Sequence, residues 1–186
     1  AIRHTSVIPI AGDQITNDIA MALRTPTREA EEIKRKFGCA LSDLADPEDV
    51  LDVAGVDDRP SRKLSRRALA DVIQPRVEEL FELIQAELRR AGFEEVLSSG
   101  IVLTGGASLM PGMIELGEEV FHMPVRLGIP KYNGALADVV QNPRFATVCG
   151  LLMEAQTQRK RGMKVRETSD VKQVFGRMKA WFEKNF

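Results

Sequence analysis

GIVLTGGAS, residues 100–108, joins a short apolar run to a pair of glycines. The apolar run predicts a buried strand, and the glycines predict a tight turn into a helix that begins near Met110 and Pro111. Glycine in such a turn lets a ligand approach the backbone, and the helix start offers unpaired N–H groups. Gly105 and Gly106 are therefore candidate ligand-binding residues, although many α/β proteins use the same turn for packing alone.

Helical patterns flank this stretch on both sides. Residues 14–23 repeat apolar side chains at helical spacing, and a second helix is expected after Pro26. Gly38 is expected to end that second helix. Residues 65–91 predict a long helix, which Pro75 should kink or divide at a junction.

Strand patterns complete an α/β order. Residues 3–9 alternate like a strand, and residues 124–127 predict another strand after the glycine turn. Residues 40–62, with short alternations at 50–53, predict a small sheet or exposed hairpin that forms a second lobe. Residues 142–154 predict a last core helix, and the whole order predicts a mixed α/β fold with a partly parallel sheet. The apolar positions of that last helix are Phe145, Val148, Cys149 and Leu152.

Composition narrows the class of protein. The 186 residues are 44% hydrophobic and 28% charged, with a formal net charge of -1, which predicts a globular chain and excludes a generally basic nucleic-acid binder. Cys39 and Cys149 fit neither a zinc site nor a disulfide framework, so two buried thiols in a reducing cytoplasm are expected. The sequence begins with Ala1, inside a strand-like pattern, and we expect it to be a piece of a longer protein.

Glu31 and Lys34 lie three residues apart in the second helix and therefore share one helical face. A carboxylate in this position could accept hydrogen bonds from ribose hydroxyls, while the lysine stem packs on a base. The alternative interpretation is an ordinary helical ion pair.

A basic cluster precedes and enters the long helix. A cluster of this kind attracts an acidic or carboxylate-ended peptide, because arginine forks orient carboxylates. The alternative interpretation is a solvated helix start. The cluster consists of Arg59, Arg62, Lys63, Arg66 and Arg67, with Arg76 further along the helix.

The last sixteen residues, 171–186 (VKQVFGRMKAWFEKNF), predict an amphipathic helix that lies on an anionic membrane surface without crossing it. A polar stretch before it, residues 157–170, predicts a flexible linker. The alternative is a terminal helix docked on the protein's own core. The residues expected to contact the membrane are Val174, Phe175, Met178, Trp181 and Phe182 on the apolar side and Lys172, Arg177 and Lys179 on the basic side.

The Glu-x-x-Lys helix and the Gly-Gly turn, in this order, resemble the second half of the actin, Hsp70 and sugar-kinase ATPase superfamily. The resemblance narrows to the FtsA family of actin-like bacterial division proteins and covers essentially the whole chain. An Hsp70-like site is disfavoured, because Leu109 stands where the chaperones carry a base-stacking arginine. The segments that carry the narrower resemblance are IRHTSVIPIAGDQITNDIA, PTREAEEIKRKFGCA, RPSRKLSRRALADVIQPR and GIVLTGGAS, with the tryptophan-bearing C-terminal helix.

The resemblance implies an actin-like ATPase fold, of which this chain is the C-terminal lobe. Residues 1–25 and 96–156 would form part of the ATP-binding subdomain, residues 26–95 an inserted small α/β subdomain, and residues 157–170 and 171–186 the linker and the membrane-targeting helix. The nucleotide-contacting positions implied by the family pattern are Gly12, Asp13, Glu31, Lys34, Gly105 and Gly106.

The resemblance also implies what the chain lacks. The phosphate-binding hairpins, the catalytic acid and the Mg²⁺ site of the family should precede residue 1. We therefore expect ATP with Mg²⁺ to bind the full-length protein, with weak ATPase activity at most, and we expect neither catalysis nor appreciable ATP affinity of this chain alone. No catalytic residue and no metal ligand is assigned.

The function implied by the resemblance is mechanical. The small lobe would hold the C-terminal tail of FtsZ through Arg62 and Arg76, and the body would assemble with copies of itself and with other division proteins. The protein would tether the FtsZ ring to the cytoplasmic face of the cell membrane at the septum and help to recruit the divisome. Alternatives are half of a sugar-kinase-like or chaperone-like ATPase and an FtsA-like adaptor of pilus assembly.

Overall fold

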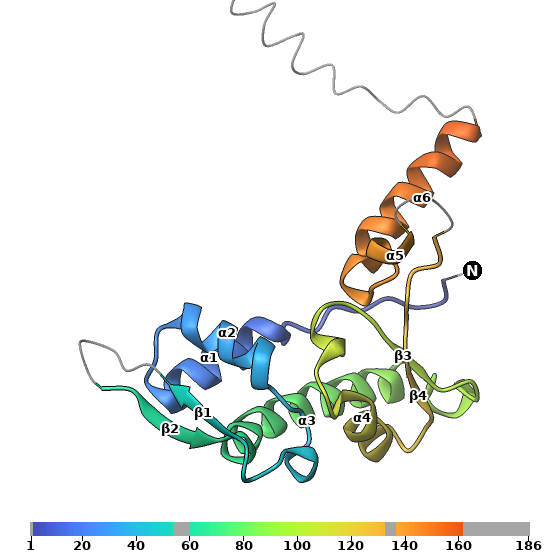
Figure 1. The fold of residues 1–186 in the computed structure, drawn as a ribbon. Coiled ribbons are helices and arrows are strands. Elements are labelled where there is room, and N and C mark those ends of the chain that lie inside the picture. Colours follow the sequence, from blue (N-terminus) through green and yellow to red (C-terminus); the bar gives the residue numbers. More distant parts are fainter. Residues whose placement is uncertain (1, 54–59, 133–136, 162–186) are drawn as a thin grey trace, which may run out of the picture. The chain divides into compact units, whose positions relative to one another are not determined.

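The structure is a computed structural model that describes residues 2–53, 60–132 and 137–161 (Figure 1). The chain divides into two compact units, Ala1–Ala146 and Thr147–Phe186. A mixed α/β fold is confirmed, with one parallel and one antiparallel pair of strands among the described residues.

The first unit begins with two packed helices, α1 (Gly12–Leu23) and α2 (Thr27–Phe37). Ile15, Ile19 and Leu23 of α1 are buried, as their spacing predicts. The strand predicted at residues 3–9 is wrong, because the backbone of this segment does not form a strand in the structure. A strand requires a partner for its backbone groups, and no described residue pairs with this segment as a strand.

The predicted hairpin region is confirmed as an antiparallel pair, β1 (Val50–Val53) and β2 (Arg62–Ser65). Leu51 and Val53 are buried while the alternate residues of β1 are exposed, which is the pattern of a strand with one face on the core. A single 3-10 turn, η1 (Ser42–Leu44), precedes the pair.

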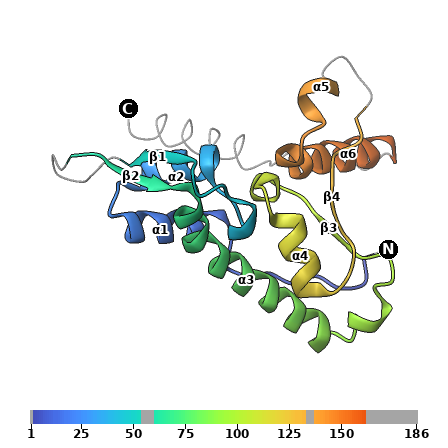
Figure 2. The same ribbon diagram turned by 60° about the horizontal axis from the view of Figure 1, so that its bottom comes forward.

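Helix α3 (Arg66–Arg90) runs the length of the first unit (Figure 2). The Ser65 side chain caps it by accepting from the Ala68 N–H. The helix continues through Pro75, so of the two predicted outcomes, a kink or a junction, the junction is excluded. Pro75 lies on the exposed side, where water can satisfy the freed carbonyl. Phe81 of α3 packs on Phe121 of the next helix, with ring centroids 5.1 Å apart.

Beyond η2 (Glu94–Val96), two parallel strands form the second sheet, β3 (Ile101–Leu103) and β4 (Val125–Leu127). The 3-10 turn η3 (Ala107–Leu109) and helix α4 (Met113–Phe121) connect them, so the helix starts later than predicted. β3 was predicted to be buried, but Val102 is 46% exposed, because the sheet has only two strands within the described residues.

The chain ends with α5 (Ala137–Val140), η4 (Pro143–Phe145) and α6 (Ala146–Lys160). α6 extends past the predicted end, so the start of the predicted linker is helical. Of the core positions predicted for α6, Cys149 is buried, but Val148 and Leu152 are exposed. No helix in the described ranges is long and apolar enough to span a membrane. The predicted membrane helix, residues 171–186, lies outside those ranges.

Candidate functional site

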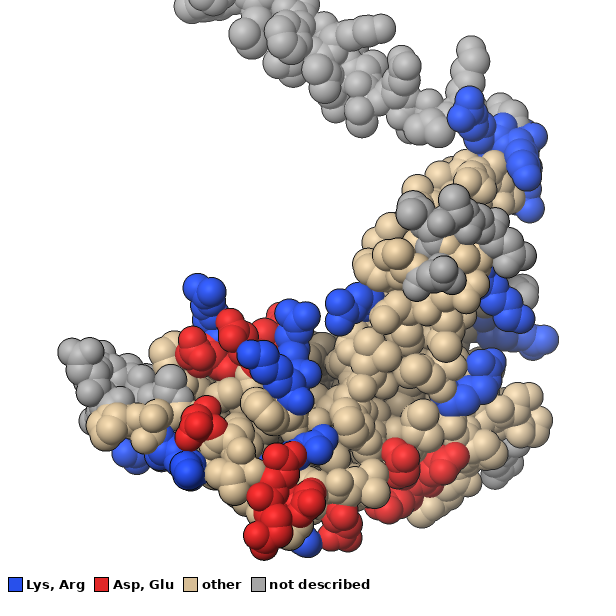
Figure 3. All heavy atoms as spheres, viewed as in Figure 1, with Lys and Arg blue, Asp and Glu red and all other residues tan. Residues whose placement is uncertain are grey.

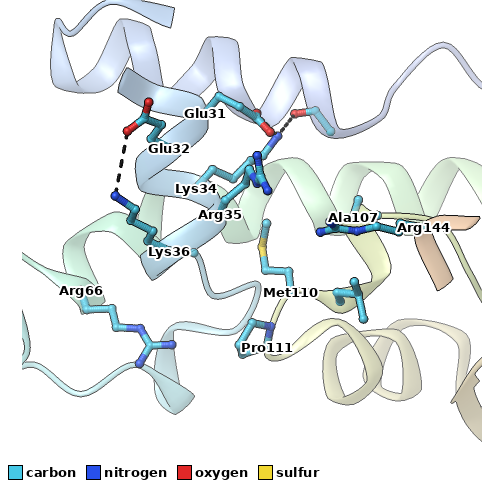
Figure 4. Close-up of a pocket in the computed structure, with 14 residues that line it drawn as sticks. Glu31, Glu32, Lys34, Arg35, Lys36, Arg66, Ala107, Met110, Pro111 and Arg144 are labelled. Atoms are coloured by element: carbon cyan, nitrogen blue, oxygen red, sulfur yellow. Dashed lines mark hydrogen bonds and ion pairs between the residues drawn. The ribbon is translucent and has the colours of Figure 1, made fainter. Parts of the chain in front are cut away.

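A cleft of about 930 Å³ lies between α2, the start of α1 and the chain that follows the glycine pair (Figure 4). It brings together Gly12, Glu31, Lys34 and Gly106, which the sequence predicts as ligand contacts. Asp13 and Gly105 do not line it but adjoin residues that do. The remaining lining residues are Glu32, Arg35, Lys36, Gly38, Arg66, Ala107, Leu109, Met110, Pro111 and Arg144.

Lys34 is the most deeply engaged charged side chain of the cleft. It is only 10% exposed and pairs with the Glu31 carboxylate at 2.5 Å. Its Nζ also donates to the Gly12 carbonyl at 2.9 Å and to the Thr16 hydroxyl at 2.7 Å. The ammonium therefore fastens α2 to the first turn of α1, in addition to the helical ion pair that its spacing predicts.

Glu31 is held in the ionised form. Burial alone would raise its pKa, but hydrogen bonds from Lys34 and Thr16 and the charges of Lys34 and Arg35 together lower the pKa below its ordinary value. The Thr16 hydroxyl donates to Glu31 Oε2 at 2.6 Å. The carboxylate remains 42% exposed, so it retains accepting capacity toward the cleft.

The cleft carries more basic than acidic side chains. Five basic residues against two glutamates line it, which gives an excess of positive charge that favours an anionic ligand. Among the described residues, the side chains of Arg35 and Arg144 form no hydrogen bond or ion pair. In Figure 4 they approach the cleft from opposite sides. Sequence reasoning missed Arg144, which had no local signal, and Arg35, whose only signal was its place beside Lys34.

The two glycines of the turn have different roles. Gly105 has φ +96°, a conformation that glycine adopts without strain, and its N–H donates to the Pro143 carbonyl at 3.1 Å. Ser108 donates to the Gly105 carbonyl at 2.7 Å and closes the turn. Gly106 has an ordinary φ of -64°, and a Cβ added there would meet only open space. The fold therefore needs a glycine at 105, whereas at 106 the absent side chain leaves the cleft wall open.

The predicted peptide-binding arginines both lie against α1. Arg62 donates to the Leu23 carbonyl at 2.6 Å, and Arg76 pairs with Asp18 and Glu79. Arg66 donates to the Phe37 carbonyl, and Arg67 pairs with Asp43. On the face drawn in Figure 3, acidic and basic side chains are accordingly interspersed over α1 to α3.

The family model for the cell division protein FtsA matches residues 1–150. The chain belongs to the FtsA family. It is 55% identical over 193 residues to the cell division protein FtsA of Pseudomonas aeruginosa and 43% identical over 192 residues to that of Neisseria meningitidis. Both alignments cover all of this chain but only 46% of the relative, so the chain spans less than half the length of these FtsA proteins.

The fold is similar to that of crystal structures of MreB5 from Spiroplasma citri. The structure bound to AMPPNP gives a TM-score of 0.63 at 17% identity, over 83% of this chain and 47% of that one. The structure bound to ADP gives 0.63 at 15% identity, over 83% and 46%. This likeness confirms the actin-like fold that the FtsA resemblance implied.

Proposed function

We propose that this chain is part of an actin-like, ATP-binding cell division protein that tethers the FtsZ ring to the cytoplasmic membrane at the septum and helps to recruit the divisome. Membership of the FtsA family supports the division role. The observation that carries the nucleotide part is that Gly12, Glu31, Lys34 and Gly106 meet in one cationic cleft.

The cleft suits the adenosine end of a nucleotide. The exposed part of the Glu31 carboxylate can accept hydrogen bonds from ribose hydroxyls, and the open wall at Gly106 admits a planar group close to the backbone. Arg35 and Arg144, which have no hydrogen-bonded or ion-paired partner in the described ranges, supply positive charge toward phosphates. Bound ATP and Mg²⁺ would complete the site together with phosphate-binding segments from the remainder of the protein, and the likeness to nucleotide-bound MreB5 favours that assignment.

Binding of a fluorescent ATP analogue with Mg²⁺, measured on the full-length protein, tests the nucleotide part. Gly106→Val should weaken binding at least about tenfold without lowering the melting temperature, because the new side chain enters the cleft and not the core. The control is Gly150→Val, at a glycine of α6 that also faces open space. Unchanged affinity of the Gly106 variant would remove the cleft as the nucleotide site.

Flotation with anionic liposomes tests the tethering part. The intact chain should float and a chain truncated after Ser169 should not, because residues 171–186 would supply the apolar stripe and basic charge that hold an interfacial helix. Trp181→Glu should also stay at the bottom, while Gln173→Glu, the same charge change on the polar side, should float. Retained binding of the Trp181 variant contradicts the anchor. A polymer of the protein would multiply such weak contacts into firm attachment.

The FtsZ tail would contact Arg62 and Arg76 on the α1 side of the small lobe. Arg62 and Arg76 reach α1 five residues apart, at Leu23 and Asp18. Because the two arginines contact α1 at nearby positions, a short acidic segment of the FtsZ tail that runs alongside α1 could contact both.

A further inference from the structure

Arg76 borders a hollow of about 260 Å³ on the surface of the first unit. Asp18 comes from α1, and Val72, Pro75 and Glu79 come from the same helix as Arg76. Val72 and Pro75 give the hollow an apolar wall beside the guanidinium. The hollow thus has room for a ligand side chain directly next to a charged group that recognises carboxylates.

Asp18 already occupies the edge of the Arg76 guanidinium, Nε and Nη2, that could bind a ligand carboxylate. Arg76 Nε donates to Asp18 Oδ2 at 2.5 Å, and Nη2 donates to Oδ1 at 3.1 Å. Two parallel hydrogen bonds of this kind are the arrangement by which an arginine binds a carboxylate ligand. These bonds raise the pKa of Arg76 above its ordinary value.

Glu79 contacts the remaining Nη1 group, but the two carboxylates are not equivalent. Glu79 lies three residues along the same helix and is 48% exposed, and such surface pairs contribute little. Asp18 is 27% exposed and makes two bonds from a different helix. An incoming carboxylate therefore competes mainly with Asp18.

We propose that Asp18 is an internal competitor at Arg76, which an incoming acidic peptide must displace, so that Asp18 sets the affinity and selectivity of the hollow. The inference rests on the proposed function, in which Arg76 receives the FtsZ tail. A neutral polar group of a ligand cannot displace the ionised Asp18 from Arg76 in this geometry, so the competition excludes weak ligands. A ligand carboxylate can displace it if an apolar side chain of the same ligand also contacts Val72 and Pro75.

Fluorescence polarisation with a labelled synthetic peptide of the FtsZ C-terminal tail tests this competition on the full-length protein. Asp18→Asn should bind about threefold to tenfold more tightly at low salt, because the neutral amide competes less well than the carboxylate. The matched control is Asp71→Asn, an exposed aspartate of α3 without a contact to Arg76, which should change affinity by less than about twofold. Adding Arg76→Ala to Asp18→Asn should abolish the gain.

The outcomes separate the competitor from the binding site itself. If the wild type binds the peptide and a folded Asp18→Asn variant binds it equally or more weakly, Asp18 is not a competitor. The assignment of the FtsZ tail as the partner then still stands. No binding by either protein rejects both. If Asp18→Asn melts at a markedly lower temperature, the polarisation assay is repeated at a temperature at which circular dichroism shows the variant to be folded. The variant should still bind the peptide more tightly than the wild type there, and equal or weaker binding rejects the competitor.

Discussion

Two regions of this molecule carry several basic side chains and differ in what their charges do. In the cleft, Arg35 and Arg144 have no hydrogen-bonded or ion-paired partner among the described residues. In the arginine cluster that enters α3, the described arginines all have partners within the chain. These pairs are Arg62 with the Leu23 carbonyl, Arg66 with the Phe37 carbonyl, Arg67 with Asp43, and Arg76 with Asp18.

The difference shows that a dense run of basic residues in the sequence does not tell where the folded protein has basic side chains without a partner. The arginine cluster lies beside α1 and the acidic segment around Asp43 and Asp49, and on folding Arg66 pairs with Asp49 and Arg67 with Asp43. The cleft collects basic side chains from α2, from the start of α3 and from η4, with Glu31 and Glu32 as its acidic lining residues. Its charge therefore remains directed toward a ligand.

The largest effect is expected from Lys34, whose charge holds the fold together, in comparison with a basic residue of the cleft that does not. Lys34→Met should destabilise the protein by about 2 to 3 kcal/mol, because it leaves the Glu31 carboxylate, the Thr16 hydroxyl and the Gly12 carbonyl without their shared donor. Urea unfolding measures this. Lys36→Met is the control; Lys36 is 67% exposed and has one ion contact at 4.0 Å, so it should cost less than about 0.5 kcal/mol. Equal costs would mean that the Lys34 network does not hold α2 on α1.

The neighbouring glycines should respond differently to the same change. Gly105→Ala should cost about 1 kcal/mol in unfolding free energy, because alanine is strained at φ +96°. Gly106→Ala should stay within about 0.5 kcal/mol, since its backbone is ordinary and its side chain meets open space. Thermal and urea unfolding compare the two, and a larger loss at 106 would contradict the division of roles.

Within the arginine cluster, neighbouring arginines should differ in their contribution to the fold. Arg66→Met should cost about 1 kcal/mol, because Arg66 satisfies the Phe37 carbonyl at the end of α2. Arg67→Met should cost less than about 0.5 kcal/mol, because Arg67 pairs with the highly exposed Asp43. If both substitutions are neutral in urea unfolding, the cluster is a solvated surface after all.

The smallest effect is the pH dependence of the cleft. The pKa of Glu31 is lowered on folding, so its ionised form stabilises the folded state above its ordinary value of 4.5, and that contribution is lost as the pH falls through the lower folded pKa. The stability difference between the wild type and Glu31→Gln should therefore narrow below about pH 4.5. Urea unfolding from pH 6 to pH 3 measures it, and a constant difference argues that Glu31 titrates as in the unfolded chain.

Local patterns predicted much of the fold. Apolar spacing placed α1 and α3, because a helix that packs on a core must repeat its buried residues, and Pro26 and Gly38 placed the two ends of α2. The strand predicted at residues 3–9 is wrong, because pairing depends on a partner that no local pattern can reveal. The apolar face of α6 was overestimated for the same reason, since burial requires a neighbour.

The sequence alone determined the FtsA resemblance and the residue types of the cleft, because Glu31, Lys34 and the Gly105-Gly106 turn are short motifs with fixed local geometry. Only the tertiary structure decided which charges stay free. Arg76 pairs with Asp18, which lies 58 residues away in the sequence, and Arg144 lines the same cleft as Lys34. Such partners are chosen by the packing of whole helices, because Coulomb and hydrogen-bond energies act at distances of a few ångströms that only the folded chain defines.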